Sequence, residues 1–310
     1  MTEQPAATTF ADRLLAAVRR RGNPVCVGLD PRAGELPEAL RPKNDDPVEL
    51  AVAFEQFSKE VIDAVAPLVA VVKPQMAFFE ELGPAGLTAL ARVIGHARLR
   101  DLIVVLDGKR NDIGSTAEAY ARGYLARGGP WQADALTVSP YLGGDSLRPF
   151  VDAAVANGAG VFVLVKTSNP GGGDFQDRKA DGRPMYEHVA AHVEGLAKET
   201  TTASGYGAVG AVVGATYPEQ LAALRSAMPH AWLLVPGYGA QGGSAADVAG
   251  AFDARGGGAI INSSRAIIFA HRRREYAGRP WQEAVAAATH DMIEELRGAT
   301  AAGKLSALPK

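Results

Sequence analysis

Short apolar runs alternate along this chain with longer segments in which apolar residues recur every three or four positions. The runs are rich in Val, Ile and Leu and show no polar alternation, which is typical of parallel strands covered on both faces. We predict strands at Val25–Leu29, Ala70–Lys73, Leu102–Leu106, Ala135–Val138, Val161–Val165, Ala208–Val213, Trp232–Val235 and Ala259–Ile261.

The segments between these runs have helical periodicity. In each of three predicted helices, apolar residues share one face. These groups are Phe10, Leu14, Leu15 and Val18; Phe54, Phe57, Val61 and Val65; and, near the end of the chain, Trp281, Val285, Ala288, Met292 and Leu296. N-caps are predicted where Ser or Thr precedes an acid by three residues, namely at Thr9 with Asp12, Ser115 with Glu118 and Thr216 with Glu219.

Eight strands alternating with helices predict an α/β fold, a single (β/α)₈ TIM barrel in preference to an open doubly wound sheet. No Ser-, Gly- or Pro-rich linker divides the chain, so we expect one domain over residues 1–310, with the barrel core at about 24–270. Extra helices precede and follow this core. Segments 35–49 and 167–184 are expected to be long loops.

Composition restricts the class of protein. Of the 310 residues, 47% are hydrophobic and the formal net charge is −2, so we expect a sizeable core and no nucleic-acid partner. No signal-peptide core and no stretch of about 18 apolar residues is present, which predicts a cytoplasmic protein without a membrane partner. The single cysteine, Cys26, excludes an internal disulfide and a cysteine zinc cluster, and it is expected to be buried.

Polar residues follow most of the predicted strands directly. In a (β/α)₈ barrel the chemistry lies at the C-terminal ends of the strands, so these residues are candidates for a site. They are Asp30, Lys73, Asp107, Lys109, Ser139, Ser168, Asn169, the glycine-rich segment 236–243, and the segment 262–265.

The charges after the third predicted strand form the first candidate. Asp107 and Lys109 are two positions apart, so their side chains can point the same way, and Asp112 follows three residues later. Lys73 ends the neighbouring strand, where a buried ammonium needs a partner such as Asp107. Alternating lysines and aspartates would keep each lysine charged. A solvated turn and a surface lysine remain the alternatives.

A glycine-rich loop follows the seventh predicted strand. Gly237–Gly242 matches G-x-G-x-x-G, but it lies in the seventh βα unit and the next strand ends in Asn262 rather than an acid, which disfavours a dinucleotide site. Backbone amides here could instead hold a phosphate, with Arg265 as the counter-charge. The alternative is a flexible loop with an exposed arginine.

Other polar segments are less specific. Ser168–Gly173 could hydrogen-bond a planar ligand or form an ordinary turn. Tyr141 and Tyr217 are expected to serve packing. No H-E-x-x-H motif and no G-x-S-x-G elbow is present, and no metal site is predicted.

Together these motifs resemble the orotidine 5'-phosphate decarboxylase family, in its longer bacterial branch. The signature is Asp107-x-Lys109-x-x-Asp112-Ile113-x-x-Thr116, with Lys73 on the preceding strand. Further matching segments, in order, are Val27–Asp30, Val72–Glu80, Lys166–Gly172, Val213–Thr216, Val235–Gly243 and Asn262–Ile267. The last reads NSSR where shorter relatives have a glycine before the arginine.

The resemblance implies a role for each residue. Lys73, Asp107, Lys109 and Asp112 would form a catalytic Lys-Asp-Lys-Asp array. The implied substrate-binding set is Asp30, Ile113, Thr116, Ser168, Pro170, Gln241, Gly242, Ser264 and Arg265. Asp30 and Lys73 would contact the ribose hydroxyls, Ser168 the pyrimidine, Arg265 the phosphate, and Gln241 both pyrimidine and phosphate.

The resemblance also implies the reaction and the assembly. Orotidine 5'-phosphate would lose CO₂ and give uridine 5'-phosphate (UMP) without a cofactor or metal, while Lys109 protonates C6. Asp112, Ile113 and Thr116 would reach the partner's site in a homodimer. Three alternatives stay open: a Mg²⁺-dependent sugar-phosphate lyase or decarboxylase of the same barrel superfamily, a Schiff-base aldolase using Lys73 or Lys109, and a non-catalytic phosphate-binding barrel.

Overall fold

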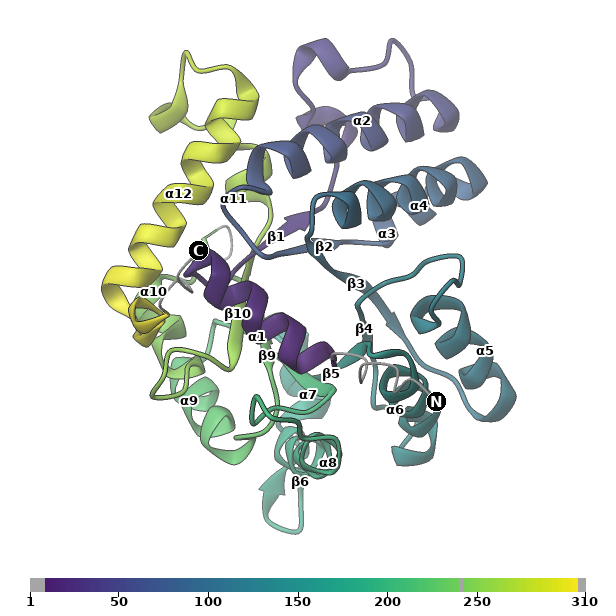
Figure 1. The fold of residues 1–310 in the computed structure, drawn as a ribbon, viewed down its shortest axis with the longest axis vertical. Coiled ribbons are helices and arrows are strands. Elements are labelled where there is room, and N and C mark those ends of the chain that lie inside the picture. The colour runs from purple at the N-terminus through teal and green to yellow at the C-terminus, as the bar shows by residue number, and fades with distance from the viewer. Residues whose placement is uncertain (1–8, 240–241, 306–310) are drawn as a thin grey trace, which may run out of the picture.

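The computed structural model describes residues 9–239 and 242–305, which contain a closed barrel of eight parallel strands (Figure 1). The strand order around the barrel is β1-β10-β9-β8-β5-β4-β3-β2, and the predicted (β/α)₈ architecture is confirmed. The barrel strands are β1 Val25–Leu29, β2 Val71–Pro74, β3 Ile103–Arg110, β4 Ala135–Val138, β5 Gly160–Lys166, β8 Val209–Val213, β9 Leu233–Val235 and β10 Ala259–Ser263.

Each predicted apolar run forms a barrel strand, and the main difference lies at the end of β3. The apolar run ends at Leu106, but the strand continues through the charged residues to Arg110. Pairing with β4 resumes there, at Arg110 opposite Val138, after a shift in register. The charges of this segment therefore belong to an irregular strand end and not to the following loop.

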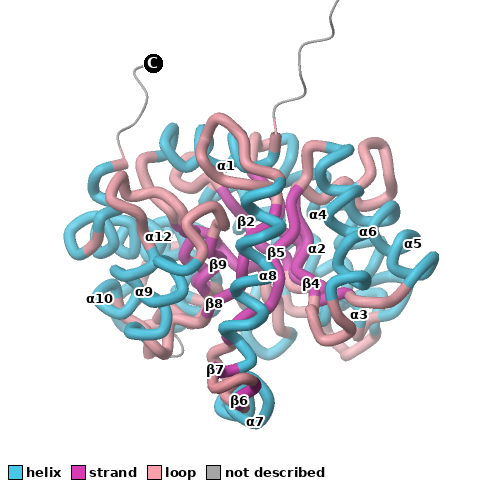
Figure 2. The backbone as a smooth tube through the Cα atoms, turned by 90° about the horizontal axis from the view of Figure 1, so that it is seen from below, coloured by secondary structure: helices cyan, strands magenta, loops and turns pink. Residues whose placement is uncertain are grey.

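Helices surround the barrel on its outside (Figure 2). Their bounds are α1 Phe10–Arg21, α2 Pro47–Val65, α3 Ala77–Glu80, α4 Gly83–Leu99, α5 Gly114–Leu125, α6 Gly144–Asn157, α7 Gly173–Gln176, α8 Met185–Glu199, α9 Pro218–Ala227, α10 Ala245–Val248, α11 Arg265–Ile268 and α12 Trp281–Ala299. Short 3₁₀ turns occupy Ala33–Glu35, Glu38–Leu40, Pro170–Gly172, Ala249–Ala251, Ala270–Arg272, Arg274–Tyr276 and Ala301–Lys304.

One of the three predicted side-chain caps is confirmed. The Thr9 hydroxyl accepts a hydrogen bond from the backbone N–H of Asp12 at the start of α1. The other two predictions are wrong. Helix α5 begins at Gly114, so Ser115 already lies inside its first turn. Helix α9 begins at Pro218, whose fixed φ suits the first helical position, so the helix starts after Thr216.

Helix α1 closes the N-terminal end of the barrel. The Arg13 guanidinium pairs with Asp134 at 2.7 Å, just before β4, and donates to the carbonyl of Gly158, just before β5. The Phe10 ring packs edge-on against Phe162 of β5, with centroids 6.0 Å apart. Because this end is filled by apolar and paired side chains, a ligand must enter from the other end.

The two segments expected to be loops contain short elements. Segment 35–49 includes a 3₁₀ turn and the first residues of α2. Segment 167–184 includes helix α7 and a small antiparallel hairpin of β6 Lys179–Ala180 and β7 Arg183–Pro184. Figure 2 shows α7 and this hairpin projecting from the end of the barrel opposite α1.

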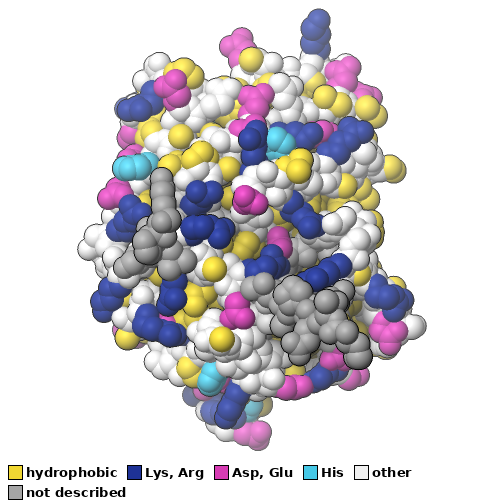
Figure 3. Space-filling model, in the orientation of Figure 1, with side chains coloured by type: hydrophobic (Ala, Val, Ile, Leu, Met, Phe, Trp, Pro, Cys, Tyr) yellow, Lys and Arg dark blue, Asp and Glu magenta, His cyan; other side chains and the backbone are white. Residues whose placement is uncertain are grey.

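The surface seen from the α1 end carries basic and acidic side chains close to one another (Figure 3). Within residues 9–239 and 242–305, no helix is both long enough and apolar enough to span a bilayer. Cys26 is fully buried on β1, as the sequence predicts, and burial raises the pKa of its thiol to about 12.

The contact between α1 and β5 gives a prediction about stability. A methyl group added at Gly160 would lie 2.3 Å from the Phe10 ring, so Gly160→Ala should lower the free energy of unfolding by about 1–3 kcal/mol. At Gly195, exposed in the middle of α8, an added methyl meets nothing within 4 Å. Gly195→Ala should therefore raise that free energy by about 0.5–1 kcal/mol. Urea unfolding of both variants checks the pair, and an unaffected Gly160→Ala protein would contradict the packing described here.

Candidate functional site

A cavity of about 290 Å³ opens at the C-terminal ends of the barrel strands. Its lining includes seven residues of the catalytic and substrate-binding sets that the resemblance implies: Asp30, Lys73, Asp107, Lys109, Ser168, Ser264 and Arg265. Other polar side chains in the lining are Gln75, Thr137, Thr167, Asn169, Tyr238 and Asn262. The barrel thus brings together residues that are far apart in the sequence.

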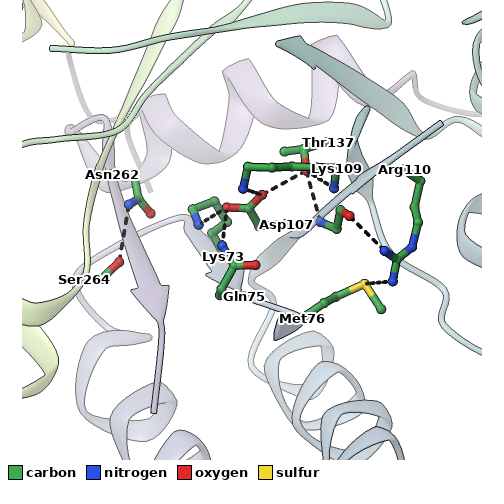
Figure 4. Close-up of polar contacts among 10 residues, drawn as sticks. Lys73, Gln75, Met76, Asp107, Lys109, Arg110, Thr137, Asn262 and Ser264 are labelled. Atoms are coloured by element: carbon green, nitrogen blue, oxygen red, sulfur yellow. Dashed lines mark hydrogen bonds and ion pairs between the residues drawn. The ribbon is translucent and has the colours of Figure 1, made fainter. Parts of the chain in front are cut away.

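Asp107 lies at the centre of the charged part of this cavity. Its Oδ2 is 2.7 Å from Lys73 Nζ, and its Oδ1 is 2.7 Å from Lys109 Nζ. The two lysines approach this carboxylate from β2 and from the end of β3 (Figure 4). Lys73 and Asp107 are only 4% and 8% exposed, whereas 48% of the Lys109 side chain is exposed. The expected Lys73–Asp107 pair is confirmed, and a surface position for Lys73 is excluded.

Two neutral groups complete the shell of hydrogen-bond donors around Asp107. The Gln75 amide donates to Oδ2 at 3.0 Å, and the Thr137 hydroxyl donates to Oδ1 at 2.9 Å. Each carboxylate oxygen therefore accepts one bond from a lysine and one from a neutral donor. Because both lone pairs of each oxygen are used, this carboxylate is already saturated with donors.

The charges in this group stabilise one another against burial. Burial by itself would raise the pKa of Asp107, but Lys73 and Lys109 outweigh it and hold that pKa well below its usual range. Burial would likewise lower the pKa of Lys73, but Asp107 and Asp30 outweigh it and raise that pKa above its usual value. Lys73 and Asp107 are therefore both ionised at neutral pH.

The side of the cavity near β1 and β10 has an acceptor without a partner. Asp30 Oδ1 is buried and has no hydrogen-bond partner among the residues that the structure describes. Nearby, a Cβ on Gly28 would lie 1.9 Å from Ser264 Oγ, so the approach of Ser264 to β1 requires glycine. A ligand hydroxyl could donate to Asp30 in this position.

Arg265 lies on the rim, at the first residue of α11, and its side chain is exposed. The neighbouring loop turns through Gly237, Gly239 and Gly242, with φ of 103°, 74° and 90°, a conformation that favours glycine. Gly242 is exposed and does not line the cavity. Gln241, assigned to the same loop by the resemblance, lies outside the described residues.

Other residues singled out from the sequence lie away from the cavity. Asp112, Ile113 and Thr116 are at and just before the start of α5, and the Asp112 carboxylate accepts from the Ile113 backbone N–H at 2.8 Å. Ile113 is 59% exposed. Pro170 is exposed at the start of a 3₁₀ turn, two residues after Ser168. A single chain therefore does not bring Asp112 to the Lys73–Asp107–Lys109 group.

The structure also brings to the site polar residues that the sequence motifs do not mark. Gln75 and Thr137 are two of them, although each stands at a strand end on the same face as a charged or polar neighbour two positions away. That alternation is the signal that could have identified them.

Lys166 was also missed, and it lies outside the cavity lining. It is fully buried at the end of β5, paired with Asp177, and its ammonium lies 5.3 Å and 5.0 Å from the ring centroids of Tyr186 and Tyr217. Tyr217 packs against this ammonium although it is 37% exposed. The packing role expected for Tyr141 is wrong within this chain, because Tyr141 is 80% exposed.

No group of three or more His, Cys, Asp or Glu side chains is placed to hold a metal ion in the part of the chain that the structure describes.

The pKa of Asp107 predicts how stability depends on pH. Because that pKa is lower in the folded protein than its ordinary 3.8, ionised Asp107 stabilises the fold above about pH 4, and this stabilisation is lost as the pH falls further. Asp107→Asn should lower the free energy of unfolding by about 3 kcal/mol at pH 7, and by about 1 kcal/mol less at pH 3. Urea unfolding at both pH values measures the difference.

The matched control is Asp181→Asn, an exposed residue in the turn between β6 and β7, which should change stability by less than about 0.5 kcal/mol at either pH. A loss for Asp107→Asn that is equal at pH 7 and pH 3 would contradict the assigned charge state.

Comparison with known proteins places this geometry in a family. The model of the "Orotidine 5'-phosphate decarboxylase / HUMPS family" matches residues 23–279. A Rhodopirellula baltica protein named orotidine 5'-phosphate decarboxylase is 59% identical over 302 residues, 94% of this chain and 99% of the relative. One of the same name from Deinococcus radiodurans is 48% identical, covering 84% of this chain and 90% of the relative.

A solved structure agrees with these relatives. It is a putative orotidine-monophosphate-decarboxylase from Toxoplasma gondii, which superposes with a TM-score of 0.81 at 34% identity over 96% of this chain and 99% of that one. A family model that covers most of the chain, together with relatives that match over nearly their whole length, is sufficient for assignment. The chain therefore belongs to the orotidine 5'-phosphate decarboxylase / HUMPS family.

Proposed function

We propose that this protein decarboxylates orotidine 5'-phosphate to UMP without a cofactor, and that Lys109 delivers the proton to C6. The observation that carries the proposal is the ionised Asp107, buried between Lys73 and Lys109 in a cavity with an arginine on its rim. The relatives named orotidine 5'-phosphate decarboxylase support the same activity.

The cavity has polar groups suited to each part of the nucleotide. In the proposed arrangement, Arg265 and the glycine loop bind the phosphate, which a guanidinium can contact with two parallel hydrogen bonds. Asp30 accepts from a ribose hydroxyl, since its Oδ1 is buried without a partner. Ser168 and Asn169, at the end of β5, face the pyrimidine. Gln241 is assigned to both pyrimidine and phosphate by the family resemblance alone.

The proposed reaction breaks the bond between C6 and the carboxylate carbon. The electron pair stays on C6, CO₂ leaves, and C6 takes a proton from Lys109 Nζ, which solvent later replaces. Carbanion character at C6 develops beside the ammonium of Lys109, which stabilises it electrostatically before the proton moves. The half-exposed Lys109 side chain opens onto the cavity, whereas the buried Lys73 is positioned to hold Asp107 and a ribose hydroxyl.

Asp107 has two effects in this scheme. It holds the Lys109 ammonium at 2.7 Å, and it places a negative charge where the substrate carboxylate would lie. Loss of CO₂ would relieve the resulting repulsion between two like charges. Phosphate binding far from C6 would contribute by holding the pyrimidine in place.

A Mg²⁺-dependent sugar-phosphate enzyme of the same superfamily is the main alternative. In such an enzyme the aspartate of this motif would have to offer a free lone pair to the metal. The four hydrogen bonds to the two oxygens of Asp107 disfavour that role. The ion pairs of Lys73 and Lys109 likewise disfavour a Schiff-base aldolase, because an ammonium group is not nucleophilic.

We also propose that the active protein is a homodimer in which Asp112, Ile113 and Thr116 complete the partner's cavity. These residues lie outside their own chain's cavity. Large apolar side chains are exposed just before α5, within it, and in the loop between β4 and α6: Ile113, Tyr120, Tyr141 and Leu142. A face of this kind is typical of a protein interface.

The substrate assignment predicts a direct assay. The protein should reduce the ultraviolet absorbance of orotidine 5'-phosphate at an undiminished rate in excess EDTA, since no metal takes part in the proposed reaction. It should not cleave or decarboxylate sugar phosphates with or without Mg²⁺. Borohydride added with a keto-sugar phosphate should trap no adduct at Lys73 or Lys109. Well-folded protein that leaves orotidine 5'-phosphate unchanged would overturn the proposal.

The shared-site assignment predicts complementation between two inactive variants. Lys109→Ala and Asp112→Ala should each lose most activity alone. Mixed in equal amounts under conditions that exchange subunits, they should recover about a quarter of wild-type activity, because half the dimers are mixed and one of their two sites is intact. Two copies of Lys109→Ala from separate preparations serve as the control. No recovery in verified mixed dimers would contradict a shared site.

A further inference from the structure

We propose that Thr137 is a positioning residue for the reaction, acting through Asp107 and Lys109 and not on the substrate. The inference rests on the proposed function, in which Lys109 is the proton donor. Thr137 lies on β4 and is 1% exposed. Its hydroxyl makes three hydrogen bonds to consecutive residues of β3, and this is the juxtaposition that carries the inference (Figure 4).

The three bonds use the whole capacity of one hydroxyl group. Thr137 Oγ1 donates to Asp107 Oδ1 at 2.9 Å. The same oxygen accepts from the backbone N–H of Gly108 at 3.1 Å and of Lys109 at 2.9 Å. A hydroxyl has one hydrogen to donate and two lone pairs to accept with, so the group is saturated.

The irregular end of β3 explains why a side chain is needed there. Leu106 pairs with Leu136 and Arg110 pairs with Val138, so residues 107–109 face the single β4 residue Thr137. This excess of residues is a bulge, and it leaves the N–H groups of Gly108 and Lys109 without the regular backbone acceptors. The threonine hydroxyl takes the place of those acceptors.

The bulge also sets the direction of the catalytic side chain. Lys109 has φ of 47°, in the left-handed region that residues other than glycine seldom adopt. In this conformation its ammonium lies 2.7 Å from Asp107 Oδ1, the oxygen that the Thr137 hydroxyl also contacts. Thr137 therefore holds both the backbone of the proton donor and the carboxylate that orients it.

The test compares substitutions that separate the hydroxyl from the volume of the side chain. Thr137→Val keeps the shape and removes all three hydrogen bonds, Thr137→Ser keeps the hydroxyl, and Thr137→Cys leaves a weak donor and acceptor. Thr289→Val is the matched control, because Thr289 is also fully buried and its hydroxyl donates to a backbone carbonyl, that of Val285 in α12.

The expected order of kcat for orotidine 5'-phosphate is wild type and Thr137→Ser first, within about threefold of each other, then Thr137→Cys, then Thr137→Val. Thr137→Val should lose about 100-fold in kcat, the scale expected when a reacting group is displaced by about 1 Å. Its KM and its affinity for UMP, measured by calorimetry, should stay within about threefold of wild type. Thr289→Val should keep wild-type kcat.

Two outcomes would overturn the inference. One is a Thr137→Val protein with the kcat of wild type. If the valine variant does not fold, a Thr137→Cys protein with the kcat of wild type has the same meaning. The other is a loss in Thr137→Ser or Thr289→Val as large as that in Thr137→Val, which would indicate a general effect of altering a buried threonine. Wild-type protein without activity on orotidine 5'-phosphate would instead contradict the proposed function, so the two failures are distinguishable.

Discussion

The carboxylate of Asp107 is buried between the ammonium groups of Lys73 and Lys109, and much of the surrounding structure keeps all three in contact. Removing charges from water costs several kcal/mol for each ion, which attraction and hydrogen bonds must offset. Here two ion pairs and the hydrogen bonds from Gln75 and Thr137 offset the cost of burial, and together they occupy the acceptor sites of both carboxylate oxygens. Such a group is stable only where several strand ends meet, because no single element could supply all of these donors.

The barrel provides that meeting point. Lys73 comes from β2, Asp107 and Lys109 from β3, and Thr137 from β4, which are neighbours in the closed sheet. Helix α1 fills the opposite end, so the charged group lies at the open end together with Arg265 on its rim. The regular part of the barrel fixes the positions of the strands, and the irregular end of β3 then turns Lys109 toward Asp107.

The fold was largely predictable because barrel strands buried on both faces leave continuous apolar runs, and each predicted run forms a strand. The pairing of Lys73 with Asp107 followed from the cost of a lone buried charge. The caps expected at Ser115 and Thr216 do not form, because the two helices begin at Gly114 and Pro218. The point at which the chain leaves each barrel strand sets these starts, and it overrides the local preference of Ser and Thr for the cap position. The left-handed Lys109 and the proposed role of Thr137 depend on a register shift between two strands, which no spacing within one strand encodes.

In the proposed mechanism Lys109, held by Asp107, gives its proton to C6. A single-turnover reaction with orotidine 5'-phosphate in D₂O tests it most directly, with wild type compared to Lys109→Ala after UMP binding has verified that the variant is folded. Wild type is expected to form UMP with one deuterium at C6, and the variant is expected to be slower by about 100-fold or more. Deuterated product formed by Lys109→Ala at the wild-type rate would contradict it.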